Sequence, residues 1–174
     1  DSHVLVCYSY NEKQDLEKIT DAVGADTCLE YRNHLLVRKI DRNKNSFYWK
    51  YDKYEEGARA VGTWGDGDVL NLQIDYYDEE RYNTVRIQQE NRLSEYHYDE
   101  RMLCTKIIYP DLTETREEYN DKYQLISQTD EEGRFTLYQY NGWSQITAIT
   151  RADASKVCFS YDETGRLVEV KNPE

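Results

Sequence analysis

Apolar and polar residues alternate along short stretches of this chain, and each stretch ends at a tyrosine. Two residues before the tyrosine, six of seven stretches carry an apolar or aromatic side chain: Tyr8, Leu29, Trp49, Tyr96, Tyr138 and Phe159, with Glu117 as the exception. The residue directly before the tyrosine is polar in all seven. An alternation of period two is typical of a β-strand with one buried and one wetter face. The pattern therefore predicts seven strands that end alike.

The tyrosines that end these stretches recur at a nearly constant interval. They are Tyr10, Tyr31, Tyr51, Tyr98, Tyr119, Tyr140 and Tyr161, and we call them the anchor tyrosines. The last four follow one another every 21 residues, and the first three are separated by 21 and 20. A period of this length indicates an array in which each unit buries its apolar face only by stacking on its neighbours.

Turn-forming residues follow the anchor tyrosines. Six of the seven following residues are Asp or Asn, whose side chains bond the backbone two residues on: Asn11, Asp52, Asp99, Asn120, Asn141 and Asp162, against Arg32 in the seventh unit. In the last unit the turn reads Asp162 to Gly165, and glycine can adopt the positive φ that such a turn needs. Apolar residues about six positions after the anchor, such as Leu16, Leu125, Ile146 and Leu167, begin a second strand. A second turn closes each unit, as at residues 21–24 in one unit and 130–133 in another.

These units predict an all-β fold, a curved and spiralling antiparallel sheet of tandem hairpin repeats of about 21 residues. Seven or eight units give roughly 14–16 strands, and an open sheet rarely exceeds about 10 without curling. The repeat fails between residues 54 and 75, and Tyr76 or Tyr77 is the candidate anchor of a degenerate unit before Tyr98. We expect residues 1–174 to form one repeat segment of a larger protein, with a non-repeat insertion at about 54–75. Both chain ends have the appearance of cuts through that larger protein.

The amino-acid composition limits the classes of molecule that this chain is expected to bind. The formal net charge of −12 argues against nucleic acid and anionic membranes, which attract basic surfaces. No apolar run approaches the roughly 18 residues of a spanning helix, and no signal peptide is apparent. Seventeen tyrosines and three tryptophans compensate for few aliphatic residues, because each ring buries roughly 150–250 Å².

The four cysteines favour free thiols over disulfides. Cys7, Cys28 and Cys158 each lie three residues before an anchor tyrosine, and Cys104 stands apart. Equivalent positions in neighbouring two-strand units are roughly 10 Å apart, which exceeds the bridging limit of about 7 Å. This predicts assembly in a reducing compartment.

Candidate chemistry is sparse, and we predict no catalytic residue, no cofactor-binding residue and no metal ligand. Most carboxylates occupy turn positions, where capping the backbone explains them. The Asp66–Asp68 stretch lacks the spaced oxygens of a calcium loop and is interpreted as a glycine-rich turn. His3, His34 and His97 have no metal-ligand spacing, and His97 is interpreted as a solvated strand residue. The aromatic ladder suits either sugar stacking or wall packing, and we favour packing.

The motif at residues 159–167, Phe-Ser-Tyr-Asp-Glu-Thr-Gly-Arg-Leu, resembles the YD repeat of the Rhs family. Related patterns stand at residues 96–99 and 138–141. Two further stretches, 33–38 and 63–67, resemble the Rhs proteins exported by type VI secretion. The resemblance implies β-repeats that wind into a hollow cocoon around a C-terminal toxin, in a polymorphic toxin of interbacterial competition.

The Rhs resemblance gives this chain a structural role, since the family's spike-adaptor region, self-cleavage segment and toxin are missing from it. The expected partners are the remainder of the same shell, its enclosed toxin and, through the full-length parent, secretion spike or adaptor proteins. The expected location is the bacterial cytoplasm before export and then the target cell. Edge-to-edge self-association of the fragment is a further expectation, because exposed strand edges pair readily. The alternatives are a carbohydrate- or cell-surface-binding module and, third, an enzyme such as a glycosidase.

Overall fold

The computed structural model describes residues 4–172, and nearly all of its regular structure is β-strand. The strands are β1 (Val6–Tyr10), β2 (Leu16–Asp21), β3 (Asp26–Arg32), β4 (Leu35–Ile40), β5 (Ser46–Tyr51), β6 (Ala60–Gly65), β7 (Leu72–Tyr77), β8 (Tyr82–Ile87), β9 (Arg92–Tyr98), β10 (Cys104–Ile108), β11 (Glu114–Tyr119), β12 (Leu125–Thr129), β13 (Phe135–Tyr140), β14 (Ile146–Arg151), β15 (Lys156–Tyr161) and β16 (Leu167–Lys171). One short 3-10 helix, η1 (Asp66–Asp68), lies between β6 and β7. No helix of residues 4–172 has the length and apolarity needed to cross a membrane.

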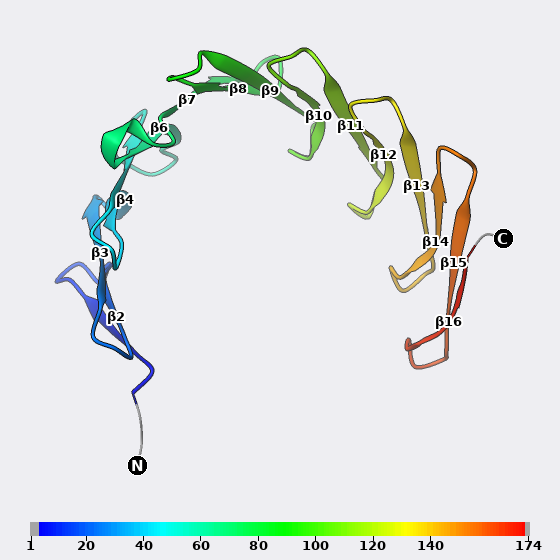
Figure 1. The fold of residues 1–174 in the computed structure, drawn as a ribbon, viewed down its shortest axis with the longest axis horizontal. Coiled ribbons are helices and arrows are strands. Elements are labelled where there is room, and N and C mark those ends of the chain that lie inside the picture. The colour runs from blue at the N-terminus through cyan, green and yellow to red at the C-terminus, as the bar shows by residue number, and fades with distance from the viewer. Residues whose placement is uncertain (1–3, 173–174) are drawn as a thin grey trace. The chain divides into compact units, whose positions relative to one another are not determined.

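The sixteen strands form one sheet whose order is the order of the sequence, from β1 to β16 (Figure 1). Every pairing with a recorded register is antiparallel, as in β1 with β2 and β15 with β16. The prediction of an all-β, antiparallel sheet of two-strand repeats is confirmed.

The chain divides into two compact units. Unit 1 runs to Tyr76 and includes Thr84–Leu93, and unit 2 comprises Tyr77–Asn83 and the residues from Ser94 onward. Strands β7, β8 and β9 contribute residues to both units.

A shift in pairing register marks the anchor tyrosine in the hairpins. In the first hairpin, Ser9 pairs with Lys18 but Tyr10 pairs with Leu16, so that Glu17 is an extra residue on the second strand. The same shift occurs between Gln139 and Tyr140. It recurs at Tyr31, Tyr51, Tyr119 and Tyr161, and opposite Tyr98 it falls within β10. An extra residue of this kind bends its strand and increases the local twist. The bulges therefore supply curvature repeat by repeat.

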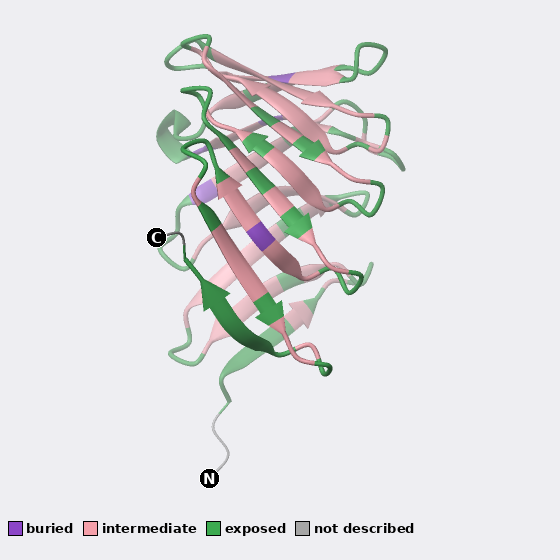
Figure 2. Ribbon diagram, turned by 90° about the vertical axis from the view of Figure 1, so that its right-hand side faces the viewer, coloured by how far each residue is buried: buried purple, intermediate pink, exposed green. Residues whose placement is uncertain are grey.

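In each unit the sheet is a single layer. Among the described residues, the buried side chains are the apolar Ala148 and the polar Ser46 and Thr84, and most strand residues are half-buried (Figure 2). The accessible surface is 12368 Å² for a chain of 20.8 kDa, whereas a compact monomer of that mass exposes about 8,900 Å². Within each unit, no second layer of described residues covers either face of the sheet, which accounts for the excess of roughly 3,400 Å².

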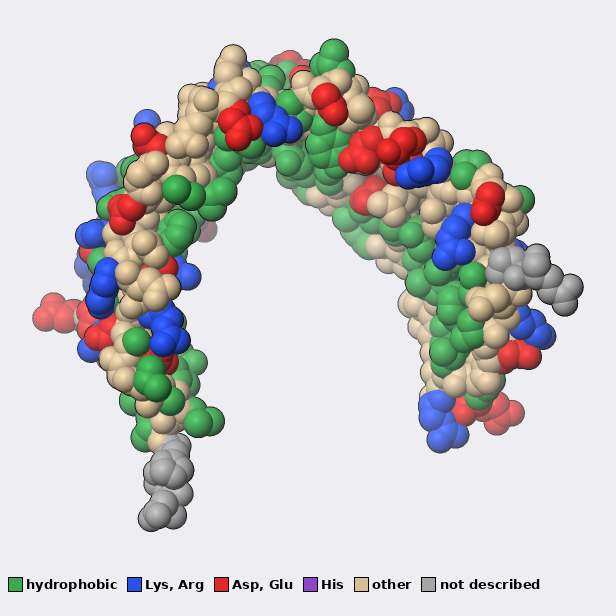
Figure 3. Space-filling model, in the orientation of Figure 1, with side chains coloured by type: hydrophobic (Ala, Val, Ile, Leu, Met, Phe, Trp, Pro, Cys, Tyr) green, Lys and Arg blue, Asp and Glu red, His purple; other side chains and the backbone are tan. Residues whose placement is uncertain are grey.

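The two faces of the sheet differ in polarity. Cross-strand partners share a face, and on one face they are mostly apolar, such as Tyr8 with Ile19 in unit 1 and Tyr138 with Ile149 in unit 2. We call this the apolar face. The opposite, polar face carries pairs such as Glu30 with Arg38 and Lys106 with Arg116. In each unit, hydrophobic side chains gather along one side of the sheet, and most charged side chains lie on the other side and at the turns (Figure 3).

Candidate functional site

Several tyrosine hydroxyls join a repeat to the one before it. Those of three anchor tyrosines and of Tyr76 donate to a backbone carbonyl in the preceding strand: Tyr51 to Leu36 at 2.9 Å, Tyr76 to Ala60 at 2.8 Å, Tyr140 to Leu125 at 2.8 Å and Tyr161 to Ile146 at 2.9 Å. In each case the accepting residue is paired with the previous anchor, as Ile146 is with Tyr140. Tyr76, rather than Tyr77, is thus the anchor of the degenerate unit.

The accepting carbonyls lie where two strands begin to separate. Strand β12 pairs with β13 from Ser127 to Thr129, and Leu125 lies two residues before the first pair. The hydroxyl of Tyr140 supplies the hydrogen bond that the ladder does not make there. Burial raises the pKa of Tyr140 as well as those of Tyr51 and Tyr76, because it disfavours the charged phenolate. These hydroxyls are structural groups of the sheet.

Tyr119 differs from these four tyrosines. Its hydroxyl donates to the carboxylate of Glu117, two residues earlier on the same strand. This hydrogen bond, together with burial and the nearby negative charge, raises the pKa of Tyr119 to about 12. In the aligned units the position of Glu117 is otherwise apolar or aromatic, so this pair is a local variation of the repeat.

The turn carboxylates and amides cap their own turns, as the sequence predicts. The Asp162 side chain accepts hydrogen bonds from the backbone N–H groups of Thr164 and Arg166, both at 2.9 Å. Its hydrogen bonds, led by that from the Thr164 hydroxyl, lower the pKa of Asp162 to about 2. The same two-bond pattern occurs at Asn11, Asp21, Asp41, Asp99, Asn120, Asp130 and Asn141.

Most of these turns have a residue other than glycine at the position where φ is positive. Glycine occupies it at Gly24, Gly133 and Gly165. In seven further turns a residue with a side chain has positive φ: Gln14, Lys44, Met102, Leu112, Tyr123, Ser144 and Ala154. The sequence pattern revealed the capping residue but not this strained position.

The histidines and cysteines do not form a site. His34 Nδ1 lies 2.6 Å from Asp15 Oδ1 and lowers the pKa of that carboxyl. His97 is not the solvated strand residue that the sequence predicts, since its ring is half-buried and stacks on Tyr82 with centroids 5.2 Å apart. His3 lies outside the described residues. All four cysteines are free thiols, and within residues 4–172 no three His, Cys, Asp or Glu side chains gather where a metal could bind.

Residues 54–75 contain β6 and the start of β7, and their extra length lies in two loops. The turn after Tyr51 is closed by the backbone bond from Asp52 N–H to Arg59, a span of seven residues instead of the usual four. In the second loop, the Asp66 carboxylate accepts from the Ser46 backbone N–H at 2.7 Å. The Asp66–Asp68 stretch is thus an elaborated turn.

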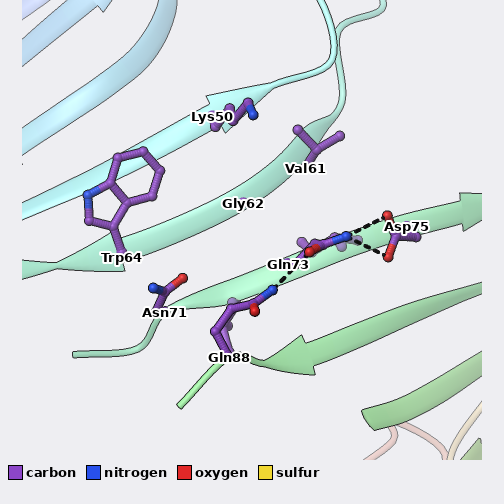
Figure 4. Close-up of a pocket in the computed structure, with 10 residues that line it drawn as sticks. Lys50, Val61, Gly62, Trp64, Asn71, Gln73, Asp75 and Gln88 are labelled. Atoms are coloured by element: carbon purple, nitrogen blue, oxygen red, sulfur yellow. Dashed lines mark hydrogen bonds between the residues drawn. The ribbon is translucent and has the colours of Figure 1, made fainter. Parts of the chain in front are cut away.

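A cavity of about 530 Å³ lies beside these loops in unit 1, on the polar face (Figure 4). Side chains from three strands and two loops surround it, and Gly62 lies at its floor. They include Lys50, Trp64, Asn71, Gln73, Asp75 and Gln88. Sequence reasoning pointed to this region but named none of these residues as ligand-binding. The one feature of the sequence that could have pointed to this region is Gly62, a glycine within a strand at a position where the other units have a side chain.

A comparison with protein-family models matches one part of the chain. Residues 119–156 match the model described as RHS Repeat, which confirms the resemblance to the Rhs family over this stretch. No curated protein matches the chain significantly.

Several solved structures align with most of this chain at low identity. The crystal structure of TcdB2-TccC3 without its hypervariable C-terminal region matches with a TM-score of 0.49 and 9% identity over 95% of this chain. That of TcdB2-TccC3-Cdc42 has a TM-score of 0.44 and 8% identity over 96%. The Tc holotoxin pore of Photorhabdus luminescens has a TM-score of 0.36 and 8% identity over 96%. This chain spans only 12–14% of the length of those chains.

Proposed function

From the RHS repeat at residues 119–156, we propose that this chain is a stretch of the wall of an Rhs β-shell, with a structural role and no catalytic one. The single uncovered layer carries the proposal. The exposed surface exceeds that of a compact monomer by roughly 3,400 Å², an area of the size that obligate partners bury. A sheet of this kind is completed by neighbours.

Along the sheet, the neighbours of this stretch are further repeats of the same shell. Strands β1 and β16 are the two edges, and an edge strand presents unpaired N–H and C=O groups to another strand. In the full-length parent these edges pair with the remainder of the shell. In the isolated chain the same groups drive edge-to-edge self-association.

The neighbour across the apolar face is an enclosed C-terminal toxin. This face carries rings and aliphatic side chains, such as Tyr96 paired with Ile107 and Phe159 paired with Val170. A continuous apolar wall around a toxin separates it from the producing cell by exclusion, and it holds the cargo without specific bonds until delivery.

The delivery route that fits the resemblance of residues 33–38 and 63–67 is type VI secretion, with spike or adaptor proteins bound elsewhere on the parent. Free thiols fit assembly in the bacterial cytoplasm before export. A competition assay tests the route: a producer that lacks a functional type VI apparatus should no longer inhibit a sensitive neighbour. Unchanged inhibition would exclude this route.

Limited proteolysis of the full-length parent tests encapsulation. We expect the toxin domain to be digested much more slowly inside the parent than as a free domain. A parent with Gln139→Pro is the matched control, because proline removes a ladder hydrogen bond from a central strand and should open the wall at β13. If the intact parent's toxin is digested as fast as the free domain, the proposal is wrong.

A further inference from the structure

Three consecutive turns on one edge of unit 2 carry large apolar side chains. The turns follow β9, β11 and β13, and these residues are Met102, Tyr123 and Trp143. Their side chains are strongly exposed, by 75% at Met102, 61% at Tyr123 and 64% at Trp143. Turns that follow alternate strands of an antiparallel sheet lie on the same edge. The three residues therefore form one row along that edge, which we call the rim row.

Local structure does not account for two residues of the rim row. Met102 and Tyr123 have φ values of +64° and +62°, in the left-handed region where a side chain is disfavoured and glycine is favoured. The corresponding residues in the turns after β1 and β15 are Gln14 and Gly165. A large side chain that is both strained and exposed contributes little to the fold. Strained residues of this kind are typical of functional positions.

The surroundings of Tyr123 prepare the row for a ligand. Arg101 from the first turn donates to the Asn120 carbonyl at 2.7 Å, and its guanidinium lies 5.4 Å from the centroid of the Tyr123 ring. This contact restricts the ring before a ligand arrives, which lowers the entropic cost of binding. Between the second and third turns, a cleft of about 370 Å³ is lined by side chains that include Lys122 and Tyr138.

The spacing of the rim row favours one kind of ligand. Equivalent points on neighbouring turns of this edge are two strands apart, which is roughly 9.5 Å. A polyproline II helix has three residues per turn and a rise of about 3.1 Å, so its equivalent side chains are roughly 9.3 Å apart. In an α-helix, residues seven apart are separated by about 10.5 Å, which is out of step after two intervals. In an extended strand, residues three apart face opposite sides.

Hydrogen-bonding groups and charge support the same ligand. A polyproline II backbone makes no internal hydrogen bonds, so its carbonyls are available as acceptors. Within residues 4–172, no hydrogen bond engages the Tyr123 hydroxyl or the Trp143 indole N–H, and both groups are donors. Unit 2 contains 19 acidic and 10 basic residues, a formal charge of −9 out of −12 for the chain. Basic residues in the ligand are therefore favoured.

We propose that the rim row binds a proline-rich, basic segment of a partner protein in the polyproline II conformation. Prolines at every third position pack on Met102, Tyr123 and Trp143, since such segments dock on surfaces lined by aromatic side chains. Lysine or arginine between the prolines meets the acidic surroundings of unit 2. The rim row lies on the turns and uses neither face of the sheet, so its failure would leave the proposed function untouched.

Fluorescence anisotropy with a labelled synthetic peptide tests this proposal on the 174-residue chain. The probe consists of four repeats of Pro-Ala-Arg, and we expect saturable binding with a Kd of about 100 μM. A control peptide of the same composition, with its prolines alternately two and four residues apart, should bind about fivefold more weakly. Tighter binding of a basic amphipathic α-helical peptide than of the probe would overturn the proposal.

Matched variants make the test specific. Trp143→Ala removes an exposed ring and should weaken binding about tenfold. Met102→Gly should weaken binding several-fold without lowering the melting temperature, because relief of the positive φ offsets the greater freedom of glycine in the unfolded chain. Leu112→Gly is the control, since Leu112 is 84% exposed at a φ of +68° in a turn on the opposite edge. It should keep the stability and bind the probe as the wild type does.

Three results would overturn the proposal. They are the absence of saturable binding of the probe, unchanged binding by Trp143→Ala, and an equal loss of binding in Met102→Gly and Leu112→Gly. Sedimentation of Trp143→Ala separates the remaining alternative. Weaker self-association with unchanged peptide binding would assign the rim row to a contact with another copy of the chain, against the proposal.

Discussion

Removal of one hydroxyl should show whether the anchor tyrosines hold neighbouring repeats together. In Tyr140→Phe the ring stays, but the 2.8 Å hydrogen bond to the Leu125 carbonyl is lost. The matched control is Tyr138→Phe on the same strand, whose hydroxyl lies 3.4 Å from Gln128 in an exposed position. The two variants differ only in what the lost hydroxyl contacts.

The magnitude follows from the surroundings of the Leu125 carbonyl. An intramolecular hydrogen bond contributes roughly 0.5–1.5 kcal/mol net, and an acceptor left unsatisfied in a buried place costs about 1–3 kcal/mol. Tyr140 is half-buried, so water reaches part of the site and the lower range applies. We expect the free energy of unfolding to fall by about 1 kcal/mol in Tyr140→Phe, a factor of roughly 5 in the unfolding equilibrium. In Tyr138→Phe the change should stay below about 0.3 kcal/mol.

Urea unfolding of the 174-residue chain, followed by far-UV circular dichroism, measures both variants. Equal m-values are required for the comparison, because repeat arrays do not always unfold in one step. Equal stability of Tyr140→Phe and Tyr138→Phe would refute the role of the hydroxyl and leave the anchor tyrosines as packing rings alone.

Three other predictions concern the turns and the titrating groups. Gly133→Ala should lower the free energy of unfolding by about 1 kcal/mol, because φ is +77° there and nothing else crowds a Cβ; Gly142→Ala, without a positive φ, should be neutral, and an equal loss in both would refute the reasoning. The folded pKa of Tyr119 is raised from 10.0 to about 12, so the stability that its hydroxyl contributes is complete below pH 10 and is lost as the pH rises toward 12. Glu117→Gln should weaken this alkaline loss of stability in thermal melts across that range. An unchanged profile would count against the role of the Glu117 bond. The folded pKa of Asp162 is lowered from 3.8 to about 2, so its contribution is present above pH 3.8 and lost as the pH falls toward 2; Asp162→Asn should flatten that loss in acid melts.

The strands and turns were predictable because they follow from local chemistry. Alternation along residues such as Phe159, Ser160 and Tyr161 needs only the period of a strand, and Asp162 bonds its own turn. The tyrosine hydroxyl bonds were not predictable in the same way. Which carbonyl is left without a ladder partner depends on where the bulge places Leu125 relative to β13, and this emerges only when three strands are assembled.

The candidate site was predictable only as a region. The loss of the repeat near residues 54–75 indicated where to look, but the cavity is formed by residues as far apart in the sequence as Lys50 and Gln88. His97 shows the converse limit. Its position is polar in every aligned unit, yet Tyr82 from the neighbouring strand covers the ring.

The strict sequence order of the strands sets the order in which this sheet can be built. Each strand pairs only with the strands directly before and after it, so a hairpin that leaves the ribosome finds its partner already in place and waits for no distant segment. Contacts that are local in sequence form fast. The growing sheet always carries one unfinished edge, and an unfinished edge is the part that can pair with the wrong chain. A hairpin forms in about 1–10 μs, whereas about 21 residues take roughly 1–4 s to synthesise, so the unfinished edge waits on synthesis and stays open to a wrong partner until the next repeat emerges.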